Sequence, residues 1–498
     1  MIDTAALRKK VLDLAIRGKL VPQDPTDEPA SVLLERIHEQ KLQMVREGKL
    51  KAKDVKDDTI IFKGDDNCYY EKFSDGTIKN IQDEIPFDLP DDWSWCRLKC
   101  ICPYGECDNV ECSEIKNDDW ILDLEDIEKD SGKILAFAKK SDKNSISTKH
   151  KFYQGQLLYS KLRPYLNKVV IAPKTGYCTS EILPLLFWGN IDVHYMQMYL
   201  MSNVFLSYTD KISYGVKMPR LGTADGKQAL IALPPNNEQK LIAKTFQDVL
   251  PSLETIKTEQ CALEDIINLL KSKILELAIQ GKLVPQDEND EPASVLLERI
   301  RAERKAKLGK KYVESYIYKG DDNCYYENND GKVAIVNEFL PFDLPDGWTY
   351  VRLENVLNYE QPTEYIVEST DYRSEYKTPV LTAGKSFIIG YTNETVGIKS
   401  ELPVIIFDDF TTDSKYVDFP FKVKSSAMKI LTADKLLIDT KYAYYVMQTV
   451  ECDHETHKRY WISEYGRTII GLPPLNEQLK IVNQIEYLFS LLDNGKEP

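Results

Sequence analysis

The chain has 498 residues, 43% of them hydrophobic and 29% charged, which is the composition of a globular protein too long for one hydrophobic core. No apolar run reaches the length that spans a bilayer, and the N-terminus lacks a signal-peptide pattern, so we expect no membrane association and a cytoplasmic location. The net charge of -15 excludes a protein that coats nucleic acid through charge alone, although it leaves room for a local basic face.

One stretch occurs twice and divides the chain. Residues 13–37 and 276–300 differ at only four of 25 positions, at an offset of 263. Three more segments return in the same order: 63–71, 85–98 and 233–239 reappear at 319–327, 340–353 and 472–478. This pattern predicts a duplicated unit, in which a helical region is followed by a lead-in segment and a body. The predicted boundaries are 1–50, 51–90 and 91–235, then 236–314, 315–346 and 347–475, and finally a C-terminal helix at 476–498.

The two bodies share no comparable identity, although the frame around them is repeated. One scaffold that carries two different specificities would leave this pattern, whereas redundant enzyme domains would keep common catalytic residues. Both bodies are expected to be mixed α/β. Strands are predicted at 156–160, 168–172 and 403–407 and helices near 193–209 and 440–450, while charged helical extensions or linkers are expected at 38–62 and 301–314.

A long central helix is predicted between the bodies. From Ile242 to Leu277, apolar residues keep the alternating four-and-three spacing of a coiled-coil seam. Asn236 or Asn237 can cap the helix, and Gly281 with a following proline closes it. About 44 residues at 1.5 Å each give a rod of roughly 65 Å.

The same seam can be placed at both ends of the chain, on Ile481 and Ile485 and on Leu7 and Val11. We therefore expect the termini to meet and to form a composite rod that packs antiparallel against the central one about a pseudo-two-fold. The alternative is two separate amphipathic helices, 1–19 and 476–498, each on its own domain.

Ten cysteines fit a reducing compartment if they are unpaired. Five cluster at Cys96, Cys100, Cys102, Cys107 and Cys112; small buried residues are favoured there over a zinc site, because no paired C-x-x-C or nearby histidine is present. For His454 and His457, a polar contact loop is favoured over a metal site. Phosphate-loop, metalloprotease, nucleophile-elbow, dinucleotide and adenine-methyltransferase motifs are all missing, so we expect no catalysis by this chain.

A basic stretch in the first body suits contact with nucleic acid. Between residues 145 and 228, ten cations face four acids, with tyrosines interleaved. The second body is not basic as a whole, and its candidates are local patches and a threonine loop; in both bodies the alternative is a solvated face. The predicted DNA-binding residues are Lys149, Lys151, Lys161, Arg163, Tyr165, Lys168, Lys217, Arg220, Thr411, Thr412, Lys415, Lys422, Lys424, Lys429, His457, Lys458, Arg459 and Tyr460, and no catalytic or metal-ligating residue is predicted.

The repeated motifs resemble the conserved regions of type I restriction-modification specificity subunits. They are Gly18-Lys-Leu-Val-Pro-Gln23, Ala30-Ser-Val-Leu-Leu-Glu-Arg-Ile37, Leu344-Pro-Asp-Gly-Trp348 and Leu472-Pro-Pro-Leu-Asn-Glu-Gln478. Residues 159–168 and 407–416 look like segments of target-recognition domains. The resemblance covers essentially the whole chain.

The resemblance implies an α+β chain in which two globular mixed α/β target-recognition domains are joined by two long antiparallel coiled-coil helices, with a pseudo-two-fold and a circular arrangement. Each domain would read one half of a bipartite double-stranded DNA site, and the helices would set the spacer and dock two methylation subunits. Two restriction subunits would complete the complex. No cofactor is expected on this chain; S-adenosylmethionine, ATP and Mg²⁺ are expected on the partners. The alternative is a non-enzymatic scaffold with two protein-binding domains, followed by a nuclease that acts alone.

Overall fold

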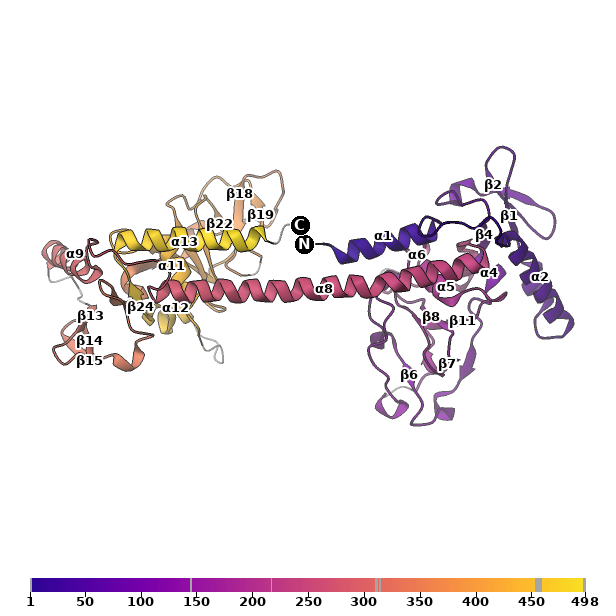
Figure 1. Ribbon diagram of the computed structural model, residues 1–498, viewed down its shortest axis with the longest axis horizontal. Coiled ribbons are helices and arrows are strands. Elements are labelled where there is room, and N and C mark those ends of the chain that lie inside the picture. Colours follow the sequence, from indigo (N-terminus) through magenta and orange to yellow (C-terminus); the bar gives the residue numbers. More distant parts are fainter. Residues whose placement is uncertain are drawn as a thin grey trace. The chain divides into compact units, whose positions relative to one another are not determined.

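The computed structural model describes residues 2–143, 146–215, 217–309, 312, 315–384, 386–452 and 459–495. These residues form two compact units, a first unit from Ile2 to Glu259 and a second unit that begins at Gln260. Both units are mixed α/β, as expected (Figure 1). Within the described residues, no helix combines the length and the apolar character needed to cross a membrane.

The two units carry the same frame. In the first it consists of α1 (Thr4–Ile16), α2 (Ala30–Arg46), α3 (Ala52–Lys56), β1 (Ile60–Lys63), β2 (Tyr69–Lys72), β3 (Ile78–Asn80), β4 (Ser94–Arg97) and β12 (Leu230–Leu233). In the second it consists of α9 (Ala293–Leu308), β13 (Ser315–Lys319), β14 (Tyr325–Asn329), β15 (Lys332–Ile335), β16 (Thr349–Arg352), β24 (Ile469–Leu472) and α13 (Leu475–Asn494).

Each lead-in segment folds as a three-stranded antiparallel meander, β1-β2-β3 in the first unit and β13-β14-β15 in the second. We did not predict these sheets from the sequence. Their turns explain part of the repeated sequence, because Asn67 and Asn323 both adopt the left-handed conformation that asparagine tolerates, with φ of 64° and 65°.

The bodies follow. The first contains α4 (Leu98–Ile101), β5 (Asp108–Val110), β6 (Ile121–Leu122), β7 (Lys149–Phe152), β8 (Leu157–Ser160), β9 (Val169–Ile171), β10 (Gly176–Thr179), β11 (Ile182–Leu185), α5 (Val193–Leu200), α6 (Asn203–Ile212) and α7 (Thr223–Gln228). The second contains α10 (Leu353–Val356), β17 (Leu357–Glu360), β18 (Thr378–Leu381), β19 (Ile388–Thr392), β20 (Val404–Asp408), β21 (Ser414–Val417), β22 (Lys422–Val423), β23 (Met428–Ala433), α11 (Thr440–Met447) and α12 (Tyr460–Ser463).

The bodies share a topology that their sequences do not show. A three-strand unit in the order β11-β8-β9 corresponds to β23-β20-β21, and the parallel pair β10-β6 corresponds to β22-β18. The helices α5 and α11 also correspond: Asp192 and Asp439 cap them through their side chains. Tyr195 and Tyr442, each three residues further on, donate to the carbonyls of Ala232 (2.6 Å) on β12 and Gly471 (3.1 Å) on β24.

The repeated motifs close a joint in the first unit. Gln23 Nε2 donates to the carbonyl of Gly18 (2.6 Å) and to Glu238 Oε1 (3.2 Å), and Trp93 Nε1 donates to Glu238 Oε2 (2.9 Å). Gly18 has φ +65°, and a Cβ there would lie 2.5 Å from Pro90 Cγ, so only glycine fits. Burial raises the pKa of Glu238, although the two hydrogen bonds oppose this rise.

The second unit repeats this joint with the equivalent residues. Gln286 donates to the Gly281 carbonyl (2.6 Å) and to Glu477 (3.2 Å), and Trp348 donates to Glu477 (3.0 Å). Gly281 has φ +66°, as a glycine that ends a helix should. The same set of hydrogen bonds therefore forms in both units, and the repeated motifs supply the residues that make it.

The central helix α8 runs from Asn236 to Ile279. Its start corrects one expectation, because Asn236 and Asn237 lie inside the helix, where their side-chain amides donate to Gly189 O (3.4 Å) and Asp27 (2.7 Å). Each terminal helix packs on the part of α8 in its own unit (Figure 1). In the first core, Leu12, Ala15 and Ile16 of α1 lie with Ile242 and Phe246.

In the second unit, Ile481 and Ile485 of α13 pack with Leu275 and Ala278 of α8. Lys271 Nζ lies 2.8 Å from Asp493 near the end of α13, so α13 runs antiparallel to this part of α8. The composite rod that would join α1 to α13, and the domain boundaries themselves, stay predictions.

Four cysteines of the predicted cluster, Cys96, Cys100, Cys102 and Cys112, are buried, and Cys107 is half-buried. Burial raises the pKa of Cys96 and of Cys100, so both stay thiols. Within the described ranges, no group of three or more potential ligands is placed to hold a metal ion. The predicted contact loop around His454 and His457 lies outside the described residues.

Candidate nucleic-acid interface

Two loops of the first body lie side by side. The β8–β9 hairpin loop, residues 161–168, is bonded to residues 217–221: Arg163 N donates to Pro219 O (2.7 Å) and Leu221 N donates to Lys161 O (2.9 Å). We call these segments the first loop pair. They bring together predicted residues that are more than 50 positions apart, namely Lys161, Arg163 and Tyr165 with Lys217 and Arg220.

Arg163 is the central residue of the first loop pair. It adopts a left-handed conformation (φ 50°), which is rare for a long side chain and marks functional loops. Its Nε is buried without a hydrogen-bond partner among the described residues. A cavity of 240 Å³ lies beside it, lined also by Lys168 and Met218. A guanidinium beside a surface cavity can donate hydrogen bonds to a phosphate oxygen or to a base edge.

The second body holds the equivalent arrangement. The β20–β21 hairpin loop, residues 409–413, is bonded to the start of α12, because Tyr460 N donates to Asp409 O (3.0 Å). We call residues 409–413 with 459–460 the second loop pair. Lys161 and Asp409 each follow the last residue of the matching strand, so Leu221 corresponds to Tyr460. The preceding residues, Arg220 and Arg459, therefore occupy the same place in both bodies.

The second hairpin loop also contains a strained residue. Thr412 has φ +60°, a rare conformation for a β-branched side chain. The exposed Thr411 lies beside it, and Phe410 is 48% exposed. The turn with the exposed Lys424 reaches this loop too, because Asp409 N donates to Ala427 O (3.2 Å). Backbone hydrogen bonds therefore bring the residues of the second loop pair together, as they do in the first loop pair.

Four predicted contacts are corrected because they are buried. Lys149, Lys422, Lys429 and Tyr460 are at most 3% exposed. Lys422 pairs with Glu394 (2.9 Å). The other lysines face inward from their strands, and all four would have to leave the core to reach DNA.

Lys429 has a supporting role instead. It pairs with Asp409 (3.4 Å), a residue of the second hairpin loop that also accepts from Trp461 N (3.0 Å). The buried pair therefore holds the loop against α12. Lys168 is tied as well, since its Nζ donates to Leu124 O (2.6 Å), and burial lowers its pKa.

The remaining predicted residues are placed as follows. Lys151 lies on β7, in the other sheet of the first body, above the ring of Tyr153 (5.1 Å). Lys415 is half-buried on β21. Lys217 and Arg459 are exposed. His457 and Lys458 lie outside the described residues.

Sequence reasoning missed two exposed side chains of these surfaces, Met218 and Phe410, and counted the exposed Tyr214 only among the interleaved tyrosines, not among the DNA-binding residues. Tyr214 pairs with Arg220 through two backbone hydrogen bonds (3.1 and 2.9 Å) and so belongs with the first loop pair. The signal that could have found them is a large apolar residue within a loop that also carries cations.

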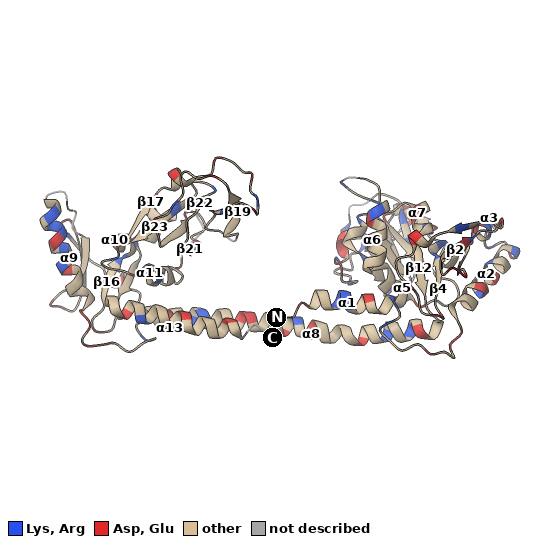
Figure 2. Ribbon diagram, turned by 90° about the horizontal axis from the view of Figure 1, so that it is seen from above, with Lys and Arg blue, Asp and Glu red and all other residues tan. Residues whose placement is uncertain are grey.

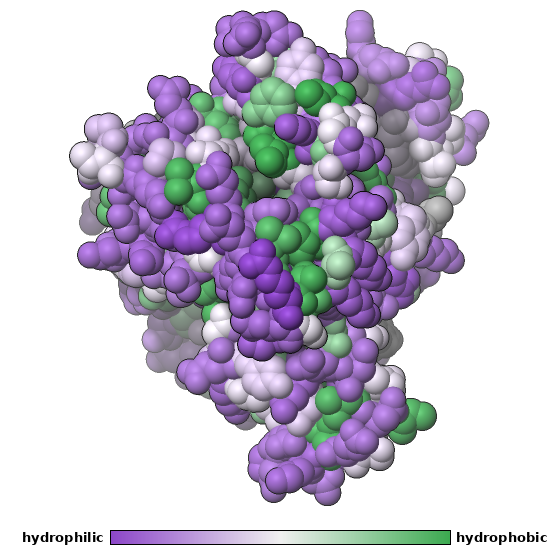
Figure 3. All heavy atoms as spheres, turned by 90° about the vertical axis from the view of Figure 1, so that its right-hand side faces the viewer, coloured by the Kyte–Doolittle hydropathy of each residue, from purple (hydrophilic) through white to green (hydrophobic). Residues whose placement is uncertain are grey.

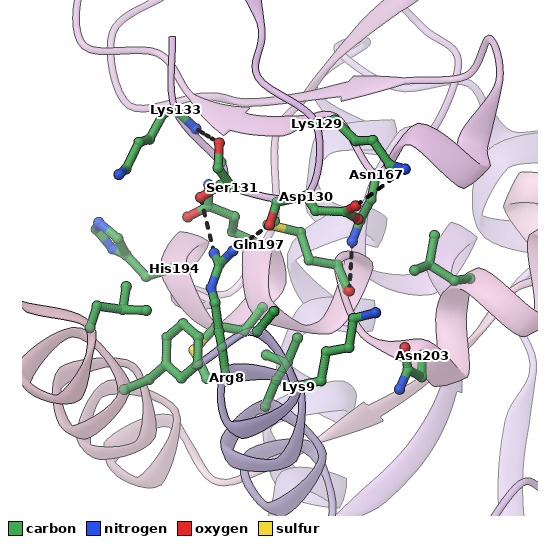
Figure 4. A pocket seen from close by; sticks show the side chains of 18 of the residues that line it. Arg8, Lys9, Lys129, Asp130, Ser131, Lys133, Asn167, His194, Gln197 and Asn203 are labelled. Carbon is green, nitrogen blue, oxygen red and sulfur yellow. Dashed lines mark hydrogen bonds and ion pairs between the residues drawn. The ribbon is translucent and has the colours of Figure 1, made fainter. Parts of the chain in front are cut away.

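A pocket of 580 Å³ connects the first loop pair to the helices (Figure 4). Arg8 of α1 donates to the carbonyls of Asp130 and Ser131 (3.0 Å for Ser131). Asp130 N in turn donates to Leu166 O of the hairpin loop (3.4 Å), and Lys133 pairs with Glu254 of α8 (3.3 Å). Burial lowers the pKa of Arg8, although nearby carboxylates oppose this change. The loop 128–133 thus connects the β8–β9 hairpin loop to both α1 and α8.

The helices of the frame carry mixed charge. Figure 2 shows basic and acidic residues interspersed along α2 and α9. Mixed charge of this kind is typical of solvated helices. The candidate DNA-binding residues therefore lie in the bodies and not on these helices.

No family model matches the chain. A type I restriction enzyme specificity subunit of Escherichia coli is 50% identical over 145 residues, which cover 28% of this chain and 35% of that protein, about a third of its length. The EcoEI specificity subunit of Escherichia coli is 25% identical over 586 residues that cover 98% of this chain and 90% of the relative. One solved structure comes from work on complex assembly and conformational transition of the type I R-M system. Its TM-score with this chain is 0.52 at 15% sequence identity, and the match covers 82% of this chain and 93% of the solved chain, which shows a shared fold.

Proposed function

By its relatives the chain is a specificity subunit of type I restriction-modification systems, and from this premise we propose that each body reads one half of a bipartite DNA site. The observation that carries the proposal is the equivalence of the two loop pairs. Two bodies that lack the sequence identity of the frame place an arginine, Arg220 or Arg459, and a strained hairpin loop at the same point of one topology. Different side chains on equivalent loops are what two readers of different half-sites require.

The proposal extends to the helices. We propose that α1 and α13 form a composite rod antiparallel to α8, with the two target-recognition domains circularly arranged about a pseudo-two-fold. The packing of each terminal helix on α8 within its own unit supports this arrangement. A rod of fixed length would then set the spacer between the half-sites.

The partners in this proposal are double-stranded DNA, two methylation subunits docked on the helices, and two restriction subunits, all in the cytoplasm. The chain itself is non-catalytic. S-adenosylmethionine, ATP and Mg²⁺ are assigned to the partners, which would methylate adenine and cleave DNA. The proposed domains keep the boundaries expected from the sequence, with target-recognition domains at 91–235 and 347–475.

Methylome sequencing of the host with and without this gene tests the proposal. Loss of one bipartite methylated motif on deletion, and its return on complementation, is the expected result. A methylome that does not change when a host with active methylation subunits loses the gene would contradict it.

A binding experiment with the purified chain distinguishes a DNA-reading subunit from a protein-binding scaffold. Binding to a duplex that carries the motif should weaken steeply with salt, because phosphate contacts release counterions. A binding constant that does not depend on salt would favour the scaffold instead.

A further inference from the structure

A cavity of 630 Å³ lies between α2 and the first β-meander, away from the first loop pair. Its wall includes Leu34 and His38 of α2, Ile61 of β1, and Trp95 of β4. Ligand pockets in proteins measure about 300–1,000 Å³ and combine apolar walls with a few polar groups, as this one does. Figure 3 looks onto the end of the first unit, where patches of apolar residues lie among polar ones.

The second unit shows that the frame does not need this cavity. The corresponding space, between α9 and β13, measures only 60 Å³. Arg301 lies over the ring of Tyr316 there, with its guanidinium carbon 3.7 Å from the ring centroid. The residues at these positions in the first repeat are His38 and Ile60, which leave the space open. An open cavity in one copy and a plugged one in the other indicate that the opening has a use.

The two repeats also differ at a buried aromatic residue below the cavity. Trp95 is 1% exposed, and its indole N–H, itself buried, has no hydrogen-bond acceptor in the described part of the chain. A buried donor of this kind costs free energy. In the second unit the equivalent Tyr350 is satisfied, because its hydroxyl donates to the carbonyl of Phe342.

The charges at the mouth favour a cation. Glu35 and Glu39 are exposed on α2 and have no ion pair within the described residues. Asp58 is already paired with Lys41, and Lys72 is the one lysine on the wall. An occupant with a positive charge next to an apolar group therefore fits better than an acidic one.

The shape favours a peptide over a compact molecule. The cavity runs between one face of a helix and β1, which is an edge strand of its sheet. A protein segment can insert an apolar side chain into such a groove.

We propose that this cavity is a docking pocket for a partner protein, which inserts an aromatic or large aliphatic side chain next to a lysine or arginine. Within the described residues the corresponding space of the second repeat is filled, so this partner binds the first repeat. The inference does not rest on the reading of DNA by the bodies.

The test uses the full chain and a fluorinated dipeptide, N-acetyl-4-fluorophenylalanyl-arginine amide, observed by ¹⁹F NMR. Binding should be weak, with a Kd on the order of 1 mM. The variant His38→Arg/Ile60→Tyr introduces the residues that fill the corresponding space of the second repeat, Arg301 and Tyr316. This plugged variant should weaken binding at least tenfold.

The matched probe with glutamate in place of arginine should bind at least threefold more weakly. No line broadening of the arginine probe with the unmodified chain at about 10 mM, or equal binding by the plugged variant, would overturn the proposal, and equal binding of both probes would overturn its charge requirement. If circular dichroism shows that the plugged variant does not fold, Glu35→Lys/Glu39→Lys takes its place. That variant should reverse the preference between the probes, and an unchanged preference would refute the assignment.

Discussion

Replacing Arg97 by methionine should destabilise the first unit more than Arg352→Met destabilises the second, although the two arginines occupy the same position of the frame. Arg97 pairs with Glu71 (2.7 Å), and their side chains are 5% and 3% exposed. Arg352 pairs with Glu327, and these side chains are 20% and 13% exposed. The second pair therefore serves as a matched control in the same molecule.

The size of the effect follows from what each arginine leaves behind. Without Arg97, the buried Glu71 carboxylate keeps one hydrogen bond, from Thr59 (2.6 Å). An uncompensated buried charge costs about 3–5 kcal/mol. Water can reach Glu327 more easily, so the equivalent change should cost about 1–2 kcal/mol.

The effect of the substitution should also depend on pH. Burial opposes ionisation of Glu71, but hydrogen bonds from Arg97 and Thr59 and the charge of Arg97 outweigh it and hold the pKa of Glu71 below its usual value of 4.5. A carboxyl with a lowered folded-state pKa adds stability above the unfolded-state pKa, and this stability is lost as the pH falls through the folded pKa. The difference between the parent chain and Arg97→Met should therefore shrink below about pH 4.5.

Hydrogen exchange measures the two units separately, which a single melting curve of a two-unit chain does not. Amides of β4 and β12 should lose protection in Arg97→Met, and those of β16 and β24 should change less in Arg352→Met. Adding Glu71→Gln to Arg97→Met should recover much of the loss, because the buried charge is gone. Equal losses in the two single variants, or no recovery in the double variant, would refute the reasoning.

Three further outcomes are expected. Lys217→Ala should lower the slope of log binding constant against log salt concentration for motif DNA by about one. Lys149→Ala, which removes a buried lysine, should lower the melting temperature and leave that slope unchanged. Equal slopes for both variants would count against DNA contact by the first loop pair. Arg8→Met should increase hydrogen exchange in residues 128–133 at least tenfold, and unchanged exchange there would show that Arg8 does not hold the loop. Burial raises the pKa of Glu238, so the contribution of Glu238 to stability falls as the pH rises from about 4.5 towards the folded pKa. In thermal melts at a series of pH values, Glu238→Gln should flatten this fall. An unaltered pH profile would disprove this.

The frame and several elements of the bodies were predictable because their signals are local. The seam from Ile242 onwards and the glycine at 281 predict a helix that the structure ends at Ile279. The strand predicted at 403–407 appears as β20, and the helix predicted near 440–450 appears as α11. In each case, periodicity and a nearby breaker are enough.

The site was less predictable because charge in a sequence does not say which way a strand faces. Lys422 and Lys429 were expected at DNA, yet each is buried against a carboxylate distant in sequence, Glu394 or Asp409. The match between Arg220 and Arg459 was hidden for a similar reason. It depends on backbone hydrogen bonds between loops, and no residue pattern in either body records them.

The meanders were missed because their strands are short and half-exposed. Ile60 is 66% exposed and Ile78 is 55% exposed, so neither strand shows the alternation of a buried face. The shared helix of the bodies did leave a signal, Ile-Asp-x-x-Tyr at 191–195 and 438–442, which is too short to recognise before its contacts are known.

The central claim is that each body reads its own half of a split site. Its most direct test replaces residues 91–235 with the same region of a related specificity subunit and sequences the methylome of a host that supplies the methylation subunits. One half of the methylated motif should change, while the other half and the spacer stay as they were. If both halves changed together, or if the motif remained intact, the account would be contradicted.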